Sequence, residues 1–138
     1  MLREPILLAD STATDEEQAR LGLIPGEMVY RVARIRGHGG QLWMENVRLP
    51  AALFPRLHKP VPRIADLADA YGFQIGEALE QVSTIAASAD IAKAIGTTEG
   101  TLLLISDRVV YLRDGRPAEW RVTYSLDQGN LARLIARL

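Results

Sequence analysis

The sequence predicts an α+β domain in which a mostly antiparallel sheet is flanked by helices. Residues 27–49 and 101–126 each alternate and fold back at a Gly-containing turn, as β-hairpins do. Short amphipathic segments that end at a glycine are typical of helices. Shifting the chain by 74 positions also places Arg34 on Arg108 and Glu45 on Glu119. We therefore expect two pseudo-repeated helix-plus-hairpin units about a pseudo-twofold axis, with helices on one side of the sheet.

The first half is expected to contain three strands and one helix. The predicted strands are 5–10, 27–36 and 41–49, and the helix is 16–21, with N-cap candidates in 11–15 and a stop at Gly22. The two later strands are joined by GHGG, which supplies the positive φ that a tight turn needs. After Pro50, the stretch AALFPRL is expected to form one or two helical turns that Pro55 kinks or ends.

The second half repeats this pattern after HKPVPR, which is expected to be a surface crossover. The predicted elements are helix 64–71, strand 77–87, Ser-capped helix 88–95 and strands 101–112 and 117–126. The tail LARLIARL spaces its apolar residues at three and four positions, which predicts an amphipathic helix.

Composition limits the possible functions. The 138 residues, 48% of them apolar, are enough for one domain with its own core. The net charge of −1 argues against DNA binding by this chain alone and against attraction to an anionic membrane. The absence of cysteine excludes disulfides, thiolate nucleophiles and Cys-based zinc sites. With no signal-like or membrane-spanning stretch in the sequence, we expect a soluble protein of the cytoplasm.

Charged residues stand at unusual places on both predicted hairpins. Arg34 and Arg36 share a strand face, and Glu45 on the return strand shares its face with apolar residues. A cross-strand Arg–Glu pair is one explanation, worth about 0.2–1 kcal/mol if exposed. On the last strand, Glu119 falls on the polar side of the alternation, where it is expected to be solvated.

No catalytic, metal or cofactor site is predicted. The sequence lacks G-x-S-x-G, the Walker loop and H-E-x-x-H, and its two histidines, His38 and His58, are isolated. Trp43 and Trp120 are expected to be core or dimer contacts. Because an Arg with a Glu could also bind a substrate and move a proton, a stand-alone enzyme remains an alternative, as does a binding or dimerisation module without a small ligand.

Several motifs in order carry a family resemblance over about residues 10–125. They are RIRGHGGQLWMENVRLPAALFPRL, YGFQIGEALEQVSTIAA, ADIAKAIG with TTEGTLLLISDRVVY, and DGRPAEWRVTY. Together they resemble the UTRA domain, the effector-sensing half of HutC-like transcription regulators in the bacterial GntR superfamily. The resemblance implies a chorismate-lyase-like fold, a small-molecule effector and a homodimer. It implies no enzyme activity, although the lyase-like fold keeps that alternative in view.

The resemblance also implies roles for particular residues. Arg34 and Arg36 match paired arginines that in some members grip an effector's phosphate or carboxylate. Glu45 and Glu119 match carboxylates that accept from hydroxyls or an amine, and Tyr124 matches an aromatic near the site. Gln81 and Ser83 lie on a strand that can line the pocket. A cleft with both charge signs favours a polar effector that is anionic or zwitterionic.

Two departures from the family pattern carry expectations of their own. Ser125 stands where many members have a second Tyr, and the closing segment LDQGNLARLIARL lacks the usual charged, aromatic-rich strand. No winged helix-turn-helix precedes the sensing sequence, so DNA contact is expected only through a domain missing from this chain. The effector is expected to bridge Arg34 and Arg36 to Glu119 or to strand 77–87.

Overall fold

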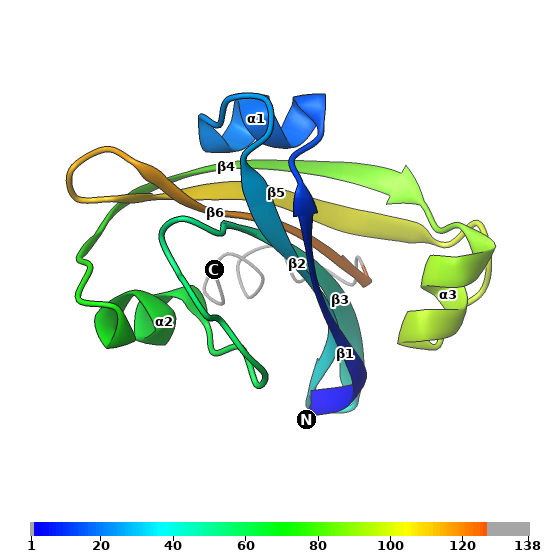
Figure 1. Cartoon of the computed structure of the whole chain (residues 1–138). Helices are drawn as coiled ribbons and strands as arrows, with labels where there is room; N and C mark the ends of the chain where they lie inside the picture. The colour runs from blue at the N-terminus through cyan, green and yellow to red at the C-terminus, as the bar shows by residue number, and fades with distance from the viewer. Residues whose placement is uncertain (1, 127–138) are drawn as a thin grey trace.

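The computed structural model describes the backbone of residues 2–126 and the side chains from residue 9 onward in that range. It contains one six-stranded antiparallel sheet with the order β1-β2-β3-β6-β5-β4 (Figure 1). The strands are β1 (Leu2–Thr12), β2 (Met28–His38), β3 (Gln41–Pro50), β4 (Ile75–Ala86), β5 (Leu102–Leu112) and β6 (Pro117–Leu126). The helices are α1 (Asp15–Leu21), α2 (Ile64–Ala70) and α3 (Ala89–Ile95). The predicted helix in the tail lies outside the described residues.

The order of the strands confirms the α+β prediction and its two repeated units. One unit is β1-α1-β2-β3 and the other is β4-α3-β5-β6, and they meet where β3 pairs with β6. The helices α1 and α3 pack on the same face of the sheet, because the apolar clusters beneath them both include Tyr124. The repeat thus places its two helices on one side, as the sequence predicts.

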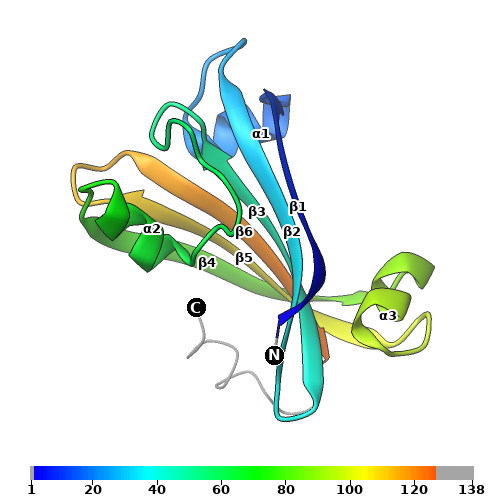
Figure 2. The ribbon, with the colours of Figure 1, turned by 60° about the horizontal axis from the view of Figure 1, so that its bottom comes forward.

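The helix α2 corrects the expectation that all helices lie on one side. It falls outside the repeat and covers the opposite face (Figure 1). There Ile64 and Leu67 join Val47 and Val110 in one buried apolar cluster. The helices α2 and α3 also lie toward opposite ends of the strands (Figure 2).

The segment before α2 forms turns rather than the predicted helical turns. Its backbone hydrogen bonds join residues three apart, as in a turn, and not four apart, as in an α-helix. The Leu53 N–H donates to the Pro50 oxygen, and the Phe54 N–H donates to the Ala51 oxygen. Pro55 blocks continuation into a helix, since a proline has no N–H to donate. Phe54, fully buried, packs edge-on against Tyr71 and Phe73 and holds the segment over the sheet.

Local signals fix the ends of the repeated helices. Thr14 caps α1 in a capping box, in which its side chain accepts from the Glu17 N–H and the Glu17 carboxylate accepts from the Thr14 N–H. Gly22 ends α1 at φ 64°, a left-handed conformation that favours glycine. In α3, the Ser88 side chain accepts from the Ile91 N–H without a reciprocal bond, and Gly96 ends the helix at φ 77°.

Both faces of β6 are buried, which corrects the prediction that Glu119 is solvated. One face carries Trp120 and Val122 beneath α1, and the other carries Glu119 and Arg121 on the side of α2. Glu119 is only 1% exposed. Alternation correctly separated the two faces, but it could not reveal that the polar one is covered.

The two hairpins differ in register. In the first, Arg34 lies directly opposite Glu45. In the second, Arg108 lies opposite Arg121 and Glu119 lies opposite Val110, with an irregularity beside the turn. The Arg–Glu spacing is equal in both halves of the sequence, so the longer second turn displaces Glu119 from its expected partner.

Candidate functional site

Charged and polar side chains form a buried layer on the sheet face beneath α2, here called the α2 face. Its side chains come from neighbouring strands and lie side by side across the sheet. Arg34 on β2 pairs with Glu45 on β3, which pairs with Thr123 on β6. Each of its members is at most 7% exposed: Arg34, Glu45, Ser106, Arg108, Glu119, Arg121 and Thr123. Buried charges are costly unless they are paired or serve a ligand, so this layer is the candidate site.

The half of the layer on β2 and β3 is held together by Glu45. Its Oε1 accepts from Arg34 Nε at 3.0 Å and from Arg36 Nε at 3.2 Å, and its Oε2 accepts from Trp43 Nε1 at 3.0 Å. Burial opposes ionisation of Glu45, but the charges of Arg121, Arg34 and Arg36 outweigh it and lower its pKa. This carboxylate is therefore ionised and already engaged.

Arg34 is also engaged in part. Its Nη1 donates to the backbone oxygen of Val61 at 2.8 Å, which ties the segment before α2 to the sheet. Its Nη2 is buried without a hydrogen-bond partner among the described residues. Burial lowers the pKa of Arg34, an effect that the adjacent Glu45 opposes.

The half of the layer on β5 and β6 contains several buried polar atoms without a hydrogen-bond partner among the described residues. Arg121 Nε lies 3.9 Å from Glu119 Oε1, at the limit of an ion pair. Burial raises the pKa of Glu119, and the nearby Arg121 and Arg108 only partly offset this. In the described part of the chain, Arg108 Nε, Glu119 Oε1 and Thr123 Oγ1 are all buried without a hydrogen-bond partner. Unsatisfied buried groups of this kind are uncommon and point to an unseen partner.

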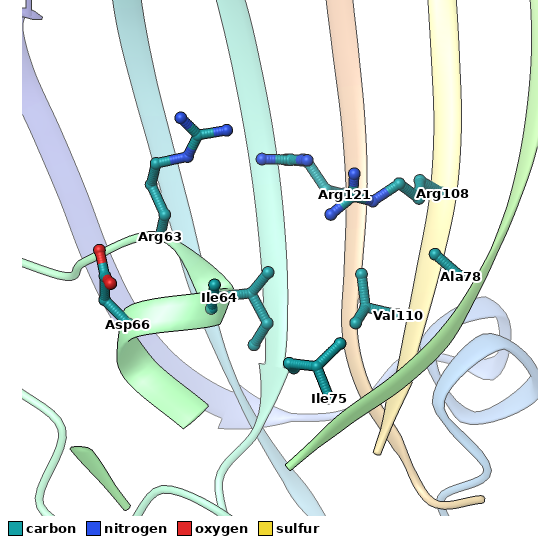
Figure 3. A pocket seen from close by; sticks show the side chains of 9 residues that line it. Arg63, Ile64, Asp66, Ile75, Ala78, Arg108, Val110 and Arg121 are labelled. Atoms are coloured by element: carbon teal, nitrogen blue, oxygen red, sulfur yellow. The ribbon is translucent and has the colours of Figure 1, made fainter. Parts of the chain in front are cut away.

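A cavity of about 490 Å³ opens beside Arg108 and Arg121, between α2 and the strands β4, β5 and β6. Arg108 and Arg121 reach it from the sheet, and Arg63, the residue that precedes α2, reaches it from above (Figure 3). Ile64 and Val110 line the other end (Figure 3). The cavity is of a size that suits a small organic molecule.

The predicted site residues do not all come together. Four of them lie on the α2 face: Arg34, Arg36, Glu45 and Glu119. The other three lie on the opposite face, here called the α1 face, around a separate open hollow of about 670 Å³: Gln81, Ser83 and Tyr124. A ligand on one face cannot contact side chains on the other, because the sheet lies between them.

Sequence reasoning missed the residues closest to the cavity. Arg63 stands just before a predicted helix, at the end of the predicted surface crossover, and the sequence pattern identifies Arg108 only as the repeat of Arg34. On β4 the side chain facing the layer is Glu80, whose Oε2 accepts from Ser106 Oγ at 2.7 Å. The available signal was strand parity, which places Glu80 on the face opposite to Gln81 and Ser83.

Within the described residues, no group of three or more His, Asp or Glu side chains is placed to hold a metal ion. None of the helices in residues 2–126 combines the length and apolar content needed to cross a bilayer.

Comparison with known proteins yields consistent matches. The family model of the UTRA domain matches residues 5–126. The HTH-type transcriptional regulator Rv0792c of Mycobacterium tuberculosis is 30% identical over 106 residues, which are 72% of this chain and 39% of that protein. The chain thus spans well under half the length of this curated relative.

Solved structures share the fold. A GntR-family transcriptional regulator from Enterococcus faecalis superposes with a TM-score of 0.80 at 23% identity, covering 88% of this chain and 90% of that one. The effector domain of PhnF from Mycobacterium smegmatis gives a TM-score of 0.80 at 21% identity, covering 88% and 77%. At these identities the structural likeness supports the fold alone.

Proposed function

Because this chain belongs to the UTRA domain family, we propose that it is the effector-sensing domain of a bacterial transcription regulator of the GntR family, HutC-like branch. The mycobacterial relative is named a transcriptional regulator, and the Mycobacterium smegmatis structure is named an effector domain. DNA binding is proposed only for an intact regulator, through a domain outside the matched region.

The observation that carries this proposal is the buried polar layer beside the cavity. Arg108 Nε and Glu119 Oε1 are buried without a hydrogen-bond partner among the described residues of the α2 face. Arg108 also lines a cavity that can hold a small molecule. A ligand with polar groups could pair with Arg108 Nε and so offset its desolvation cost of about 1–3 kcal/mol. The effector is therefore proposed to be polar, and anionic or zwitterionic, and to bind on the α2 face, where Arg34, Arg36 and Glu45 also lie.

The proposed response begins with α2. Arg63 directly precedes this helix, whereas Arg108 and Arg121 belong to the sheet, so a ligand that contacts both sides would fix α2 against the strands. A ligand shifts an equilibrium only by its differential affinity for the two states. A difference of about 1–3 kcal/mol between two arrangements of the domain is sufficient to change operator binding by an intact regulator.

Binding is favoured over catalysis as the role of this site. The lyase-like enzyme alternative rests on the fold, and a fold does not determine a reaction. The relatives found by comparison are regulators or their effector domains. The charged groups of the layer are consequently assigned to recognition of an effector, with no cofactor.

The domain is also proposed to form a homodimer through β4. This 12-residue edge strand is exposed along nearly its whole length. It presents Leu79 at 59% exposure and Ile85 at 45%. A long edge strand with apolar side chains is a template for pairing with another chain. A second copy related by a twofold axis would present the same strand in return.

A thermal-shift screen tests the sensing function and locates the site. The chain would be screened against sugar phosphates, amino acids, histidine-pathway intermediates and fatty acids. A ligand at about 100 times its Kd stabilises the folded state by about 2.7 kcal/mol, a shift of several degrees. Ala78→Trp, which fills the cavity from the exposed strand β4, is expected to abolish the shift.

The matched control is Gln81→Trp, on the same strand but facing the hollow on the α1 face. It is expected to preserve the response. If Gln81→Trp abolished the shift and Ala78→Trp did not, the effector would bind on the α1 face instead. Absence of any shift across the panel would favour a dimerisation module without a small ligand.

A further inference from the structure

Three arginines from separate parts of the chain converge on one end of the cavity. Arg63 comes from the residue before α2, Arg108 from β5 and Arg121 from β6 (Figure 3). Arg108 and Arg121 are direct partners across the β5–β6 pair, where like charges are destabilising. This pair of like charges is buried, since Arg108 is 7% exposed and Arg121 is 2% exposed.

Among the three arginines, Arg108 has the least favourable surroundings. Burial lowers the pKa of Arg108, and the charges of Arg121 and Arg63 lower it further against the opposing effects of Glu119 and Glu80. Arg108 Nε has no hydrogen-bond partner among the described residues. An anion beside Arg108 would offset the repulsion from Arg121 and Arg63 and could accept a hydrogen bond from Arg108 Nε.

Three glutamates near Arg108 do not accept from its Nε. Glu45 already accepts from Arg34, Arg36 and Trp43, on the far side of β6 from Arg108. Glu80 accepts from Ser106. Glu119 faces Val110 because of the register of the second hairpin, and burial favours its neutral form.

The opposite end of the cavity is apolar. Ile64 and Val110 are buried there, and Ile75 closes the lower edge (Figure 3). A ligand that fills the whole cavity would thus place a charged group among arginines and an uncharged body against aliphatic side chains. Free sugars and inorganic ions satisfy only one of these two conditions.

We propose that the cavity binds a small organic anion, whose carboxylate or phosphate is held by Arg63, Arg108 and Arg121 and whose apolar body packs on Ile64, Ile75 and Val110. Guanidinium groups suit this task because their planar fork matches either oxyanion. The inference rests on the proposed sensing function and specifies the ligand class. The inference assigns binding of the anion to Arg63, Arg108 and Arg121 and not to Arg34 and Arg36.

Matched pairs of probes test the charge requirement. Phenylacetate would be compared with phenylacetamide, and phenyl phosphate with phenol, each at about 10 mM in a thermal-shift assay of the whole chain. At least one of the two anions is expected to raise the Tm, and its neutral partner is expected to have no effect on the Tm. The pair that responds distinguishes a carboxylate ligand from a phosphate ligand. Equal effects within both pairs, or no effect of either anion, would overturn the proposal.

Arginine variants test the residues. Arg63→Gln, at an exposed position, and Arg108→Lys, which keeps the charge but loses the fork, are each expected to weaken binding of the active anion at least tenfold by calorimetry. Arg113→Gln is the control, since Arg113 is exposed and bonds Gln74 away from the cavity. Circular dichroism would confirm that each variant is folded.

The outcomes separate this inference from the broader function. Suppose that a ligand from the screen does not bind Ala78→Trp but still binds both arginine variants. The sensing function would then be supported, and the proposed anion site would be overturned. An anion whose binding survives Ala78→Trp would place it outside the cavity and also overturn the proposal. Inorganic phosphate, which lacks an apolar body, is expected to bind at least tenfold more weakly than phenyl phosphate or phenylacetate, whichever is active.

Discussion

Arg34 and Glu45 face each other across β2 and β3 with 2% and 5% exposure, and Arg34 also reaches the Val61 oxygen. Such a pair lacks the solvent screening that weakens surface ion pairs. Its attraction is largely offset by the cost of removing both charges from water, so its net contribution to stability is small. Removing one partner is a different matter, because the remaining charge stays buried.

Glu45→Leu is expected to lower the free energy of unfolding by about 3–5 kcal/mol, since it leaves Arg34 buried without its carboxylate. The double variant Arg34→Met, Glu45→Leu should recover most of that loss by removing both charges. Urea denaturation of the two variants measures both effects. Glu77→Leu, an exposed glutamate on β4, is the control and should change stability little. A cost below about 1 kcal/mol for Glu45→Leu would contradict this account.

At the scale of elements, α1 is held by a buried carboxylate rather than by length. The helix has only seven residues, too few to be stable alone. Glu17 accepts from Arg31 Nε at 2.7 Å and Nη2 at 2.5 Å, and Arg48 Nε lies 3.4 Å away. These bonds attach α1 to β2 and β3 and place it over Trp120, above which Arg20 and Arg48 stack.

This attachment predicts a dependence of stability on pH. Burial opposes ionisation of Glu17, but Arg31, the Thr14 N–H and Arg48 lower its pKa from 4.5 to about 2. A lowered pKa stabilises the folded state above pH 4.5, and this contribution is lost as the pH falls from 4.5 through about 2. At neutral pH, Glu17→Gln should therefore lower the free energy of unfolding by at most about 3 kcal/mol.

Urea titrations from about pH 7 to about pH 3 check this expectation. The difference between the wild-type chain and Glu17→Gln should shrink toward the acid end. Glu16→Gln provides the control, because Glu16 is exposed on the same helix. A difference that stays constant with pH would show that Glu17 acts through packing rather than through its charge.

The elements also show where sequence reasoning succeeds. Caps and glycine stops predicted α1 and α3 within about one residue, because these signals are local. Strand parity correctly placed Arg34 and Arg36 on one face and separated Glu119 from Trp120. Parity cannot reveal what covers a face of the sheet. It therefore could not predict that Glu119, on the α2 face, is buried.

The candidate site was less predictable than the fold. The residues nearest the cavity depend on tertiary placement, since Arg63 and Arg108 line the same cavity only because α2 packs on the sheet. The pairing of Arg108 with Arg121 depends on a register that the second turn sets. The spacing of residues in the sequence does not predict this register, because Arg34–Glu45 and Arg108–Glu119 have the same separation. The assignment of Gln81, Ser83 and Tyr124 to the effector stays a prediction, now for the opposite face.

At the scale of the whole molecule, the two edges of the sheet are not equivalent. In the pseudo-twofold arrangement β1 and β4 occupy corresponding edges, and β4 carries Leu79, Val82 and Ile85 exposed along it. The cavity lies between α2 and the same half of the sheet, with Ala78 on β4 in its wall. Pairing of two copies through β4 would therefore place the two effector sites close to the dimer axis. A ligand that fixed α2 would then act near the contact between subunits.

The proposed dimer can be disrupted at this edge. Leu79→Lys combined with Ile85→Lys places charges along β4, which should convert the dimer into a monomer of 15.2 kDa in light scattering at micromolar concentration. Ile24→Lys is the control, because Ile24 is 67% exposed in the connection between α1 and β2. A wild-type chain that is itself monomeric, or a double variant that remains dimeric, would contradict pairing through β4. In the second case the contact between copies must be sought on another surface, and the link between effector site and dimer axis would no longer hold.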